Sequence, residues 1–371
     1  MRNIEAGGVK ETVIERSDYP LSKVREILKD ETICVIGYGP QGRAQSLNLR
    51  DNGLKVFVCN RRDANYELAK TEGWMEGKTL FDGMGESVKK ATMVLYLLND
   101  AAQKQCWPQI GPNLRPGAAL YFSHGFSIVY RDQTAVVPPK NVDVILVAPK
   151  GSGTTVRRLF LGGRGINCSF AVFQDATGRA RERCLALGVG IGCGFLFETT
   201  FEKEVFSDLV GERGVLMGAI QGLFKAQYDL LRAKGHSPAE AFNETVEEAT
   251  QSLYPLIGEN GMDWMFSNCS ATAQRGALDW WPRFAEAVKP VFAELYERVA
   301  TGQETARVLA SNSQPDYVEK LKQELAAMDA QEMWQIGRLV RELRPERQKA
   351  AGGGAAGKKT GGKVSGKKRR K

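Results

Sequence analysis

The chain is short of several features that mark specialised classes of protein. It has no run of about 18 apolar residues, so no membrane span is expected. Its seven cysteines are scattered and contain no Cys-x-x-Cys pair, which favours a reduced compartment over a disulfide framework. No apolar stretch lies within residues 1–10, so no secretory signal is predicted. These absences leave an ordinary globular protein as the expectation.

Acidic residues are missing from the C-terminal stretch 347–371, which holds ten Lys and Arg. Removing these ten from the 51 basic residues leaves 41 against 43 acidic ones, so the formal charge of +8 belongs to this tail. Residues 350–371 are mostly Gly, Ala and Lys, and we expect them to be disordered. Basic residues could bind a polyanion weakly, but no aromatic side chain is present to stack on bases. A solvated tail without function is the alternative.

The 371 residues, 43% of them hydrophobic, are enough for two domains. In the first half, β-rich runs alternate with helical patterns, as in βαβ units around a parallel sheet. Beyond residue 198, helical periodicity takes over. We therefore expect an α/β domain over 1–198, an all-helical domain over 199–346 and the basic tail over 347–371. The expected strands are 32–36, 55–59, 93–98, 118–122, 142–147, 166–172 and 195–198.

A glycine-rich motif, Gly-Tyr-Gly-Pro-Gln-Gly at residues 37–42, follows the first expected strand and opens a helical stretch. In that position glycines allow a tight turn and close approach to a pyrophosphate, and the helix N-terminus supplies free N–H groups. The motif predicts a Rossmann-type, dinucleotide-binding domain, in preference to a glycine-rich turn made only for packing.

The end of the second expected strand bears on which dinucleotide binds. NAD enzymes usually place an Asp or Glu there to hold the ribose hydroxyls. This chain has Asn60, Arg61 and Arg62 instead. Two guanidinium groups suit a 2′-phosphate, so NADPH is favoured over NADH. Asp63 is the opposing observation, because it could contact a ribose hydroxyl.

Pairs of acidic residues in the helical half suggest a metal site. Residues spaced i, i+4 share one face of a helix, and like charges at that spacing repel. A hard cation such as Mg²⁺ would remove this cost. The pairs are Asp208 with Glu212 and Glu244 with Glu248. Glu204 and Glu247 have equally suitable spacing, so spacing alone does not choose among them, and exposed helices often carry acids that bind no metal.

Two basic residues follow expected strand ends, where open α/β sheets bind their ligands. His124 is one of only two histidines, and it could be catalytic or could line a cofactor pocket. Lys150 could face a phosphate, a carboxylate or solvent. The other histidine, His236, precedes Ser-Pro and is expected in a turn.

Together these motifs resemble the ketol-acid reductoisomerases, in particular their shorter, fungal-like form. The resemblance runs from about residue 8 to residue 346 and includes the glycine-rich motif. The other stretches that carry it, in the family's order, are Phe-Ser-His-Gly-Phe (122–126), Val-Ala-Pro-Lys-Gly (147–151), Ser-Asp-Leu-Val-Gly-Glu-Arg-Gly (207–214), Phe-Asn-Glu-Thr-Val-Glu-Glu-Ala (242–249) and Cys-Ser-Ala-Thr-Ala (269–273). It implies a Rossmann-type α/β domain followed by an all-α, knotted-type domain.

The resemblance also implies a site for NADPH, two Mg²⁺ ions and a substrate. The implied metal ligands are Asp208, which would bridge both ions, Glu212, Glu244 and Glu248. The implied catalytic residues are His124, Lys150 and Glu212, and Ser270 would contact the substrate. The residues expected to bind the cofactor are Gly37, Tyr38, Gly39, Gln41, Gly42, Arg61, Arg62, Asn65, Asn99 and Asp100.

The implied reaction starts from 2-acetolactate or 2-aceto-2-hydroxybutyrate, in valine and isoleucine biosynthesis. An alkyl group migrates between adjacent carbons, and paired Mg²⁺ ions stabilise the charge that develops. Hydride from NADPH then reduces the new ketone to a 2,3-dihydroxy acid, with Lys150 and Glu212 as candidates for moving protons. Changing Glu248 to Gln is expected to abolish isomerisation, whereas the same change at Glu247 is expected to be nearly silent.

The chain departs from the family's pattern in two places. Pro40 stands where Ser is common, at a position where proline can begin a helix. The loop after Arg62 has Asn65 in place of the usual Ser and is one residue shorter, which bears on contacts with a 2′-phosphate.

The rival interpretation is a metal-independent hydroxyacid dehydrogenase with a Rossmann and a helical domain.

The resemblance implies at least a homodimer, in which Glu244 and Glu248 reach the site from the partner subunit when the helical domain is short. A bacterial cytoplasmic location is expected. The mitochondrial matrix is the alternative, if a leader has been removed.

Overall fold

The computed structural model describes residues 1–345 and 347, so the predictions for the basic tail fall, apart from Arg347, outside the described residues. The chain forms two compact units. The first comprises Met1–Gly211 and Phe292–Gln314, and the second comprises Glu212–Val291 and the described residues from Pro315 onward. These units group residues that lie together in space and are not continuous along the chain. The domain boundary expected at residue 198 stays a prediction.

The first unit is built on one ten-stranded sheet, which contains all seven predicted strands. The order is β1-β2-β10-β9-β8-β7-β6-β3-β4-β5. The strands are β1 (Arg2–Ala6), β2 (Val9–Glu15), β3 (Ile33–Ile36), β4 (Val56–Cys59), β5 (Leu80–Phe81), β6 (Met93–Tyr96), β7 (Ala119–Phe122), β8 (Asp143–Pro149), β9 (Ile166–Gln174) and β10 (Cys193–Glu198).

The sheet is mixed, so the prediction of a parallel sheet is correct for only part of it. The strands β8, β7, β6, β3, β4 and β5, which are neighbours in that order in the sheet, all run parallel. Strand β9 is antiparallel to β8, and β10 is parallel to β9. The reversal arises because the chain leaves β8 at its carboxyl end, forms the short helix α8 (Gly153–Leu161) and enters β9 from the same edge.

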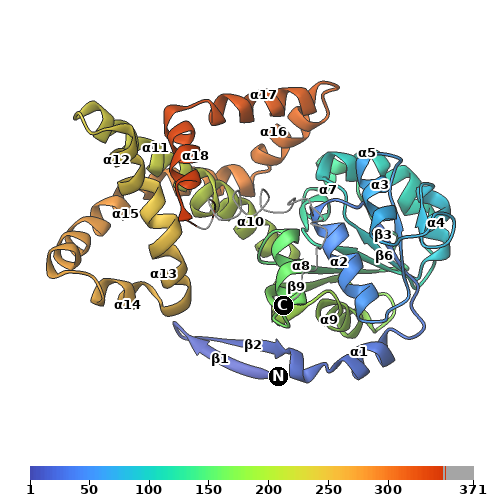
Figure 1. Cartoon of the computed structure of the whole chain (residues 1–371). Coiled ribbons are helices and arrows are strands. Elements are labelled where there is room, and N and C mark those ends of the chain that lie inside the picture. The colour runs from blue at the N-terminus through green and yellow to red at the C-terminus, as the bar shows by residue number, and fades with distance from the viewer. Residues whose placement is uncertain (346, 348–371) are drawn as a thin grey trace, which may run out of the picture. The chain divides into compact units, whose positions relative to one another are not determined.

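Helices cover both faces of this sheet, as Figure 1 shows. Helices α1, α2, α3, α8 and α9 pack on one face, and α4, α5, α6 and α10 pack on the other. Their bounds are α1 (Leu21–Ile27), α2 (Pro40–Asp51), α3 (Ala64–Thr71), α4 (Met84–Lys90), α5 (Asp100–Ile110), α6 (Phe126–Val129), α9 (Ala180–Gly190) and α10 (Phe201–Gly211). Smaller elements are η1 (Arg16–Asp18), η2 (Gly111–Asn113), α7 (Arg131–Thr134) and α16 (Gln303–Asn312).

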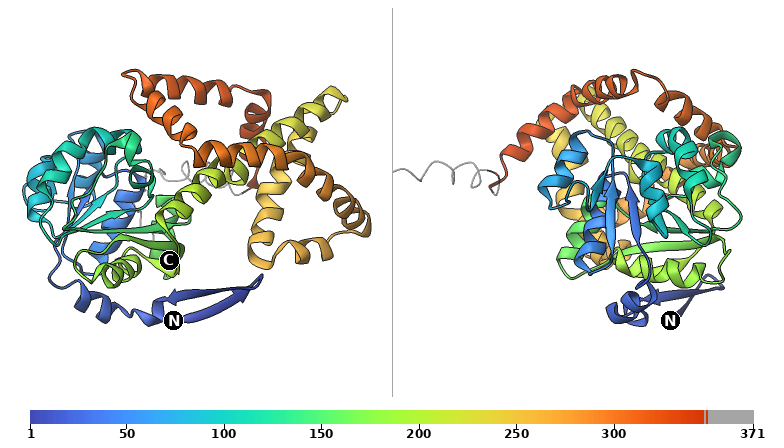
Figure 2. Two further views of the ribbon diagram at one scale, coloured as in Figure 1. Left: turned by 180° about the vertical axis from the view of Figure 1, so that it is seen from behind. Right: turned by 90° about the vertical axis from the view of Figure 1, so that its right-hand side faces the viewer.

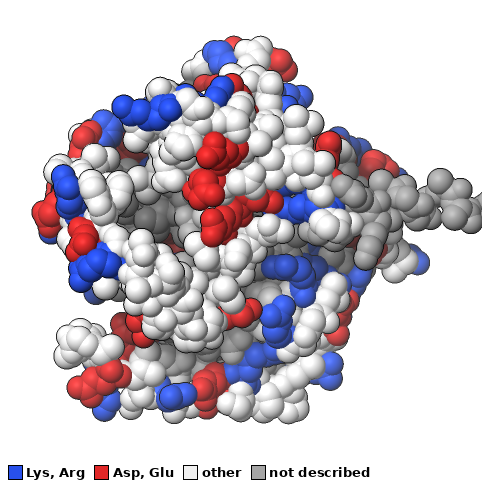
Figure 3. Space-filling model, turned by 60° about the vertical axis from the view of Figure 1, so that its left-hand side comes forward, with Lys and Arg blue, Asp and Glu red and all other residues white. Residues whose placement is uncertain are grey.

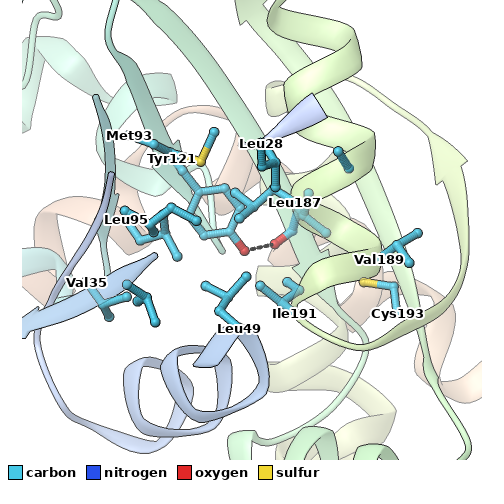
Figure 4. Close-up of a cluster of buried hydrophobic side chains, with 14 of the residues drawn as sticks. Leu28, Val35, Leu49, Met93, Leu95, Tyr121, Leu187, Val189, Ile191 and Cys193 are labelled. Carbon is cyan, nitrogen blue, oxygen red and sulfur yellow. Dashed lines mark hydrogen bonds between the residues drawn. The ribbon is translucent and has the colours of Figure 1, made fainter. Parts of the chain in front are cut away.

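Apolar side chains from strands and helices meet in the core drawn in Figure 4. Val35 and Tyr121 of the sheet lie in one buried cluster with Leu49 of α2 and Leu187 of α9. Burying an aliphatic side chain of this size contributes about 2 kcal/mol to folding. The hydroxyl of Tyr121 donates to the carbonyl of Val147 at 2.9 Å, so this polar atom is not buried unsatisfied.

A buried charged network joins α9 to the amino-terminal ends of the strands. Arg183 is 6% exposed, and it forms ion pairs with Glu31 at 2.7 Å and Asp143 at 2.9 Å. Its Nη1 also donates to the carbonyl of Gly117 at 2.9 Å. These partners precede or begin β3, β7 and β8, so one side chain fixes three strand starts at the edge opposite the glycine-rich motif.

Two features of the first unit were not predicted. Strands β1 and β2 form an antiparallel hairpin that projects from the sheet in Figures 1 and 2, and only the end of β2 pairs with β10. A disulfide joins Cys168 of β9 to Cys193 of β10, with the Cα atoms 5.9 Å apart. The expectation of reduced cysteines is therefore wrong for this pair. The sequence did not reveal it, because the two cysteines are 25 residues apart and meet only where β9 pairs with β10.

The second unit is helical, as predicted for this part of the chain. Its elements are η3 (Glu212–Leu216), α11 (Gly218–Ala233), α12 (Pro238–Phe242), η4 (Asn243–Glu247), η5 (Ala249–Leu253), α13 (Tyr254–Asn260), α14 (Met262–Ser267), α15 (Ala271–Ala300, as far as Val291), α17 (Tyr317–Asp329) and α18 (Glu332–Glu342). Tyr228, Phe242 and Met333 belong to its buried core. Ser237 caps α12, because its hydroxyl accepts from the N–H of Glu240 at 3.2 Å.

Charged side chains of both signs are mixed on the face drawn in Figure 3. This agrees with the nearly balanced charge of the chain before its basic tail. None of the helices in the described part of the chain has the length and apolar character needed to span a bilayer.

Candidate active site

The glycine-rich motif forms the turn between β3 and α2, as predicted. Strand β3 lies between β4 and β6, so the turn is at the point where the strand order reverses, the usual place for a ligand. Gly37 has φ +98°, and a Cβ there would lie 2.7 Å from the carbonyl oxygen of Leu97. A Cβ on Gly42 would lie 2.0 Å from the carbonyl oxygen of Gly37. Helix α2 begins at Pro40, which confirms that proline is tolerated there.

Three cavities in the first unit share this turn. The loop cavity, of about 180 Å³, lies between the turn and the start of α8. The β4 cavity, of about 210 Å³, extends from the turn to the residues after β4. The His124 cavity, of about 400 Å³, extends from the turn past the end of β6 to Ser123 and His124. Together they trace the carboxyl edge of the sheet.

Most residues predicted to bind the cofactor line these cavities. They are Gly37, Tyr38, Gly39, Gln41, Arg61, Asn65, Asn99 and Asp100. Gly42 and Arg62 are not among the lining residues; Gly42 packs beneath the turn, and Arg62 pairs with Glu76 and Asp82. The hydroxyl of Tyr38 donates to Glu72 Oε2 at 2.8 Å.

Gln103 is a residue of this site that the sequence did not reveal. Its amide nitrogen donates to the carbonyls of Tyr96 and Leu98, which fixes the end of β6. Its amide oxygen is buried without a hydrogen-bond partner, and Gln103 lines the His124 cavity. An unpaired buried acceptor of this kind is suited to a donor on a ligand.

A cluster of charged residues lies at the far end of the His124 cavity. His124 Nδ1 lies 3.2 Å from Asp208 Oδ2 and 3.4 Å from Glu204 Oε2. Lys150 Nζ donates to Glu204 Oε1 at 3.2 Å. The Glu204 side chain is 1% exposed. Helix α10 supplies both acids, and the ends of β7 and β8 supply the two bases.

The cluster shifts the protonation of its members. Burial lowers the pKa of His124, but Glu204 and the further charges of Asp100 and Asp208 outweigh this and raise it to about 9. Burial raises the pKa of Glu204, but His124 and Lys150 hold it below its ordinary value. At neutral pH the cluster therefore pairs a cationic imidazole with the ionised carboxylate of Glu204.

The same cluster has the donors of a cation site. One ligand atom from each of His124, Glu204 and Asp208 lies within 4.8 Å of the others. Glu204 Oε2 is buried and makes no hydrogen bond of good geometry, since its nearest base, His124 Nδ1, lies 3.4 Å away. Carboxylate oxygens suit Mg²⁺. The sequence predicted Asp208 as a ligand but could not choose Glu204.

The other predicted ligands, Glu212, Glu244 and Glu248, belong to the second unit. Glu244 and Glu248 are exposed. Glu247 is 6% exposed, and its Oε1 accepts from Arg344 Nε at 2.7 Å. Its carboxylate is therefore already paired, whereas Glu244 and Glu248 lie on the accessible side. Glu212, in η3, has Arg213 within 3.8 Å.

All three segments that carry these acids contain π-helical turns. Glu212 begins η3, Glu244 lies in η4, and Glu248 joins η4 to η5. Glu244 and Glu248 therefore lie on a stretch of π-helical turns and not on a regular α-helix. Predicted substrate residue Ser270 caps α15, accepting from the N–H of Ala273 at 3.2 Å.

The fold and the cavities define a dinucleotide-dependent oxidoreductase with a Rossmann-type domain and a helical domain. The family described as "Acetohydroxy acid isomeroreductase, NADPH-binding domain" matches residues 27–195. That described as "Ketol-acid reductoisomerase, C-terminal domain" matches residues 201–346. The chain belongs to the ketol-acid reductoisomerase family, the enzymes of branched-chain amino acid biosynthesis, and uses a nicotinamide cofactor.

Relatives with this activity cover nearly the whole chain. A ketol-acid reductoisomerase (NAD(+)) of Desulfosudis oleivorans is 61% identical over 94% of this chain and 99% of its own length. The mitochondrial enzyme of Neurospora crassa is 58% identical over 94% of this chain and 87% of its own length. A solved NADH-preferring ketol-acid reductoisomerase from an uncultured archaeon superimposes with TM-score 0.81 at 31% identity, over 90% of this chain and 99% of that one.

Proposed function

We propose that the His124 cavity and the charged cluster at its end form the active site of this reductoisomerase. The observation that carries the proposal is their continuity. One cavity of about 400 Å³ reaches from the glycine-rich turn to His124, whose imidazole contacts Glu204 and Asp208. The nicotinamide of a dinucleotide held at the turn would meet a substrate at the cluster in this space.

The proposed substrates are 2-acetolactate and 2-aceto-2-hydroxybutyrate, each with a carboxylate, a ketone and a hydroxyl on neighbouring carbons. Two Mg²⁺ ions, with Asp208, Glu212, Glu244 and Glu248 as proposed ligands, would stabilise the negative charge that develops on the substrate oxygens during migration. Ser270 is the proposed contact for the substrate itself.

The bases of the cluster have separate roles in this proposal. Lys150 is about one-third exposed, so it can donate to a substrate oxygen while it holds Glu204 ionised. His124 spans Glu204 and Asp208 and fixes the distance between them. Glu204 then accepts a proton from the substrate hydroxyl, directly or through water, with Glu212 as the alternative acceptor predicted from the sequence.

The reduced nicotinamide cofactor would give hydride to the new ketone. Sequence alone predicts NADPH, because two arginines follow β4. The Desulfosudis relative is named as an NAD(+) enzyme. The surroundings of these arginines therefore decide between the two cofactors.

A homodimer is proposed as the working form. Helix α15 exposes Trp280, Trp281 and Phe284 by more than half of each side chain. Large apolar side chains gathered on one helix are typical of an interface. Relatives include bacterial and mitochondrial forms, and the bacterial cytoplasm stays the sequence-based prediction for the compartment.

Steady-state oxidation of NADPH and NADH with 2-acetolactate, with and without Mg²⁺, tests the function. Turnover should vanish with excess EDTA and return when Mg²⁺ is restored. Binding of the cofactor should persist, because none of the four proposed Mg²⁺ ligands lines any of the three cavities. Turnover that survives the chelator would instead support the metal-independent dehydrogenase.

A further inference from the structure

The two arginines after β4 have different surroundings. Arg61 and Asp63 line the β4 cavity, where the ribose of a dinucleotide is expected. Arg62 lines none of the three cavities. Its guanidinium group instead lies between two carboxylates: Nε is 2.6 Å from Oδ2 of Asp82, and Nη2 is 2.5 Å from Oε1 of Glu76.

These contacts hold Arg62 on several sides. Asp82 follows β5 directly, and Glu76 forms a β-bridge with Leu80, so both acids lie on ordered backbone. The guanidinium carbon of Arg62 also lies 5.1 Å from the ring centroid of Tyr66 on α3. Hydrogen bonds from Arg62 lower the pKa of Glu76 and of Asp82, so both acids are ionised at neutral pH.

The charge around the end of β4 is net negative as a result. Arg61 and Arg62 are matched against Asp63, Glu76 and Asp82, which form the ion pairs there. A 2′-phosphate, like other phosphate monoesters, would add nearly two further negative charges. To bind it, Arg62 would have to leave two ionised carboxylates, which would then stand close to the phosphate.

Asp63 remains able to hold an unmodified ribose. Its Oδ1 accepts from the N–H groups of Asn65 and Tyr66 and from the Asn60 amide. Its Oδ2 accepts from Arg61 Nε at 2.9 Å. A carboxylate has about four acceptor positions, two on each oxygen, so Oδ2 can accept a ribose hydroxyl as well.

We propose that Glu76 and Asp82 determine the cofactor preference by keeping Arg62 away from the 2′-phosphate, so that the enzyme uses NADH in preference to NADPH. The inference rests on the proposed dinucleotide site. It reverses the choice that the two arginines suggest in the sequence. Glu76 and Asp82 are positioning residues, because they act on the cofactor through Arg62.

Equilibrium binding of NADH and NADPH to the full chain without substrate, followed by nicotinamide fluorescence, tests this proposal. The unmodified protein should bind NADH more tightly. The double variant E76Q/D82N should bind NADPH about tenfold more tightly than before, as expected for the release of two exposed ion pairs, with NADH affinity unchanged. Adding R62Q to the double variant should remove the gain.

The matched control is E67Q/E86Q, which removes the same charge from the same unit. Glu67 and Glu86 are exposed and pair with Lys70 and Lys89 instead of Arg62. This variant should leave the NADPH affinity almost unchanged, because neither of its acids pairs with Arg62. An equal gain in the control would overturn the proposal, since any lost acid would then suffice.

The remaining outcomes separate this inference from the proposed function. Two outcomes would overturn only the role of Arg62. In one, the unmodified protein binds NADPH as tightly as NADH; in the other, the gain in NADPH affinity of E76Q/D82N is retained when R62Q is added. The reductoisomerase site stands if Mg²⁺-dependent turnover is present in those cases. Failure of the folded protein to bind either dinucleotide overturns both.

Discussion

Glu204 has the most confined acidic side chain of the candidate site. It is buried on α10, and both of its oxygens lie within 3.4 Å of a base. A carboxylate held ionised between His124 and Lys150 can take up a proton when the charge of a substrate offsets one of those bases. Its chemistry is therefore a property of its neighbours more than of its own position on the helix.

Changing Glu204 to Gln should lower kcat by at least about 100-fold, the usual contribution of a general base. Affinity for the dinucleotide should be unchanged, because Glu204 lines none of the three cavities. Glu202 on the same helix is exposed, and its change to Gln is the control. Turnover that stays normal in E204Q would exclude this carboxylate from proton transfer.

The neighbouring acids Glu247 and Glu248 should respond in opposite ways to the same change. E248Q should abolish Mg²⁺-dependent turnover with little loss of stability, because Glu248 is exposed. E247Q should retain turnover but lower the free energy of unfolding by about 1–2 kcal/mol, because it weakens the buried pair with Arg344. Thermal unfolding and steady-state kinetics on both variants decide the matter. The sequence predicted E247Q to be nearly silent, and the Arg344 contact changes that expectation for stability.

Which residues could be predicted depends on how local their surroundings are. The glycines at 37–42 are recognisable because their backbone requirements come from the turn itself. Glu204 meets His124 and Lys150 only through the packing of α10 against α6 and β9, so spacing could not distinguish it from other acids. The sequence assigns Arg62 to the cofactor from its place after the second strand. Its true partners, Glu76 and Asp82, follow it by 14 and 20 residues and carry no motif that would reveal the contact.

At the scale of elements, Arg183 binds α9 to the starts of three strands, on the edge away from the cavities. Changing Arg183 to Met should destabilise the first unit by about 3 kcal/mol, because Glu31 and Asp143 would remain buried without their counter-charge. Chemical denaturation measures this loss, and the kcat of the folded fraction should be unaffected.

Arg181, on the same helix, is the control for this change. Its ion pair with Glu198 is exposed on both sides, so R181M should cost at most about 1 kcal/mol. Equal losses in the two variants would contradict the special role of the buried network.

The elements differ in how far the sequence specifies them. The seven predicted strands are short, apolar and rich in β-branched or aromatic residues, and that pattern is sufficient to locate them. The direction of β9 is not encoded in such a pattern, since it depends on where α8 delivers the chain. Strands β1 and β2 escaped prediction because most of the hairpin is exposed and lacks an apolar face.

At the scale of the whole molecule, the exposed aromatic side chains of α15 point to self-association. Changing Trp281 to Glu should raise the dissociation constant of the proposed dimer at least about tenfold, the effect expected for a large aromatic residue at an interface. Sedimentation velocity measures this constant. Lys289, exposed on the same helix, supplies the control K289E. A dimer that resists W281E would locate the interface elsewhere.

The π-helical turns between Glu212 and Leu253 have a consequence for how this region tolerates gaps. Inserting or deleting one residue in a helix rotates everything beyond it by about 100°. Between Glu244 and Glu248 such a change would turn one carboxylate away from the other while leaving the helix itself intact. Length is therefore constrained to the single residue here, whereas the exposed hairpin β1–β2 could gain or lose residues at its tip. In an alignment of related chains, gaps should be rare in this stretch even where side chains vary freely.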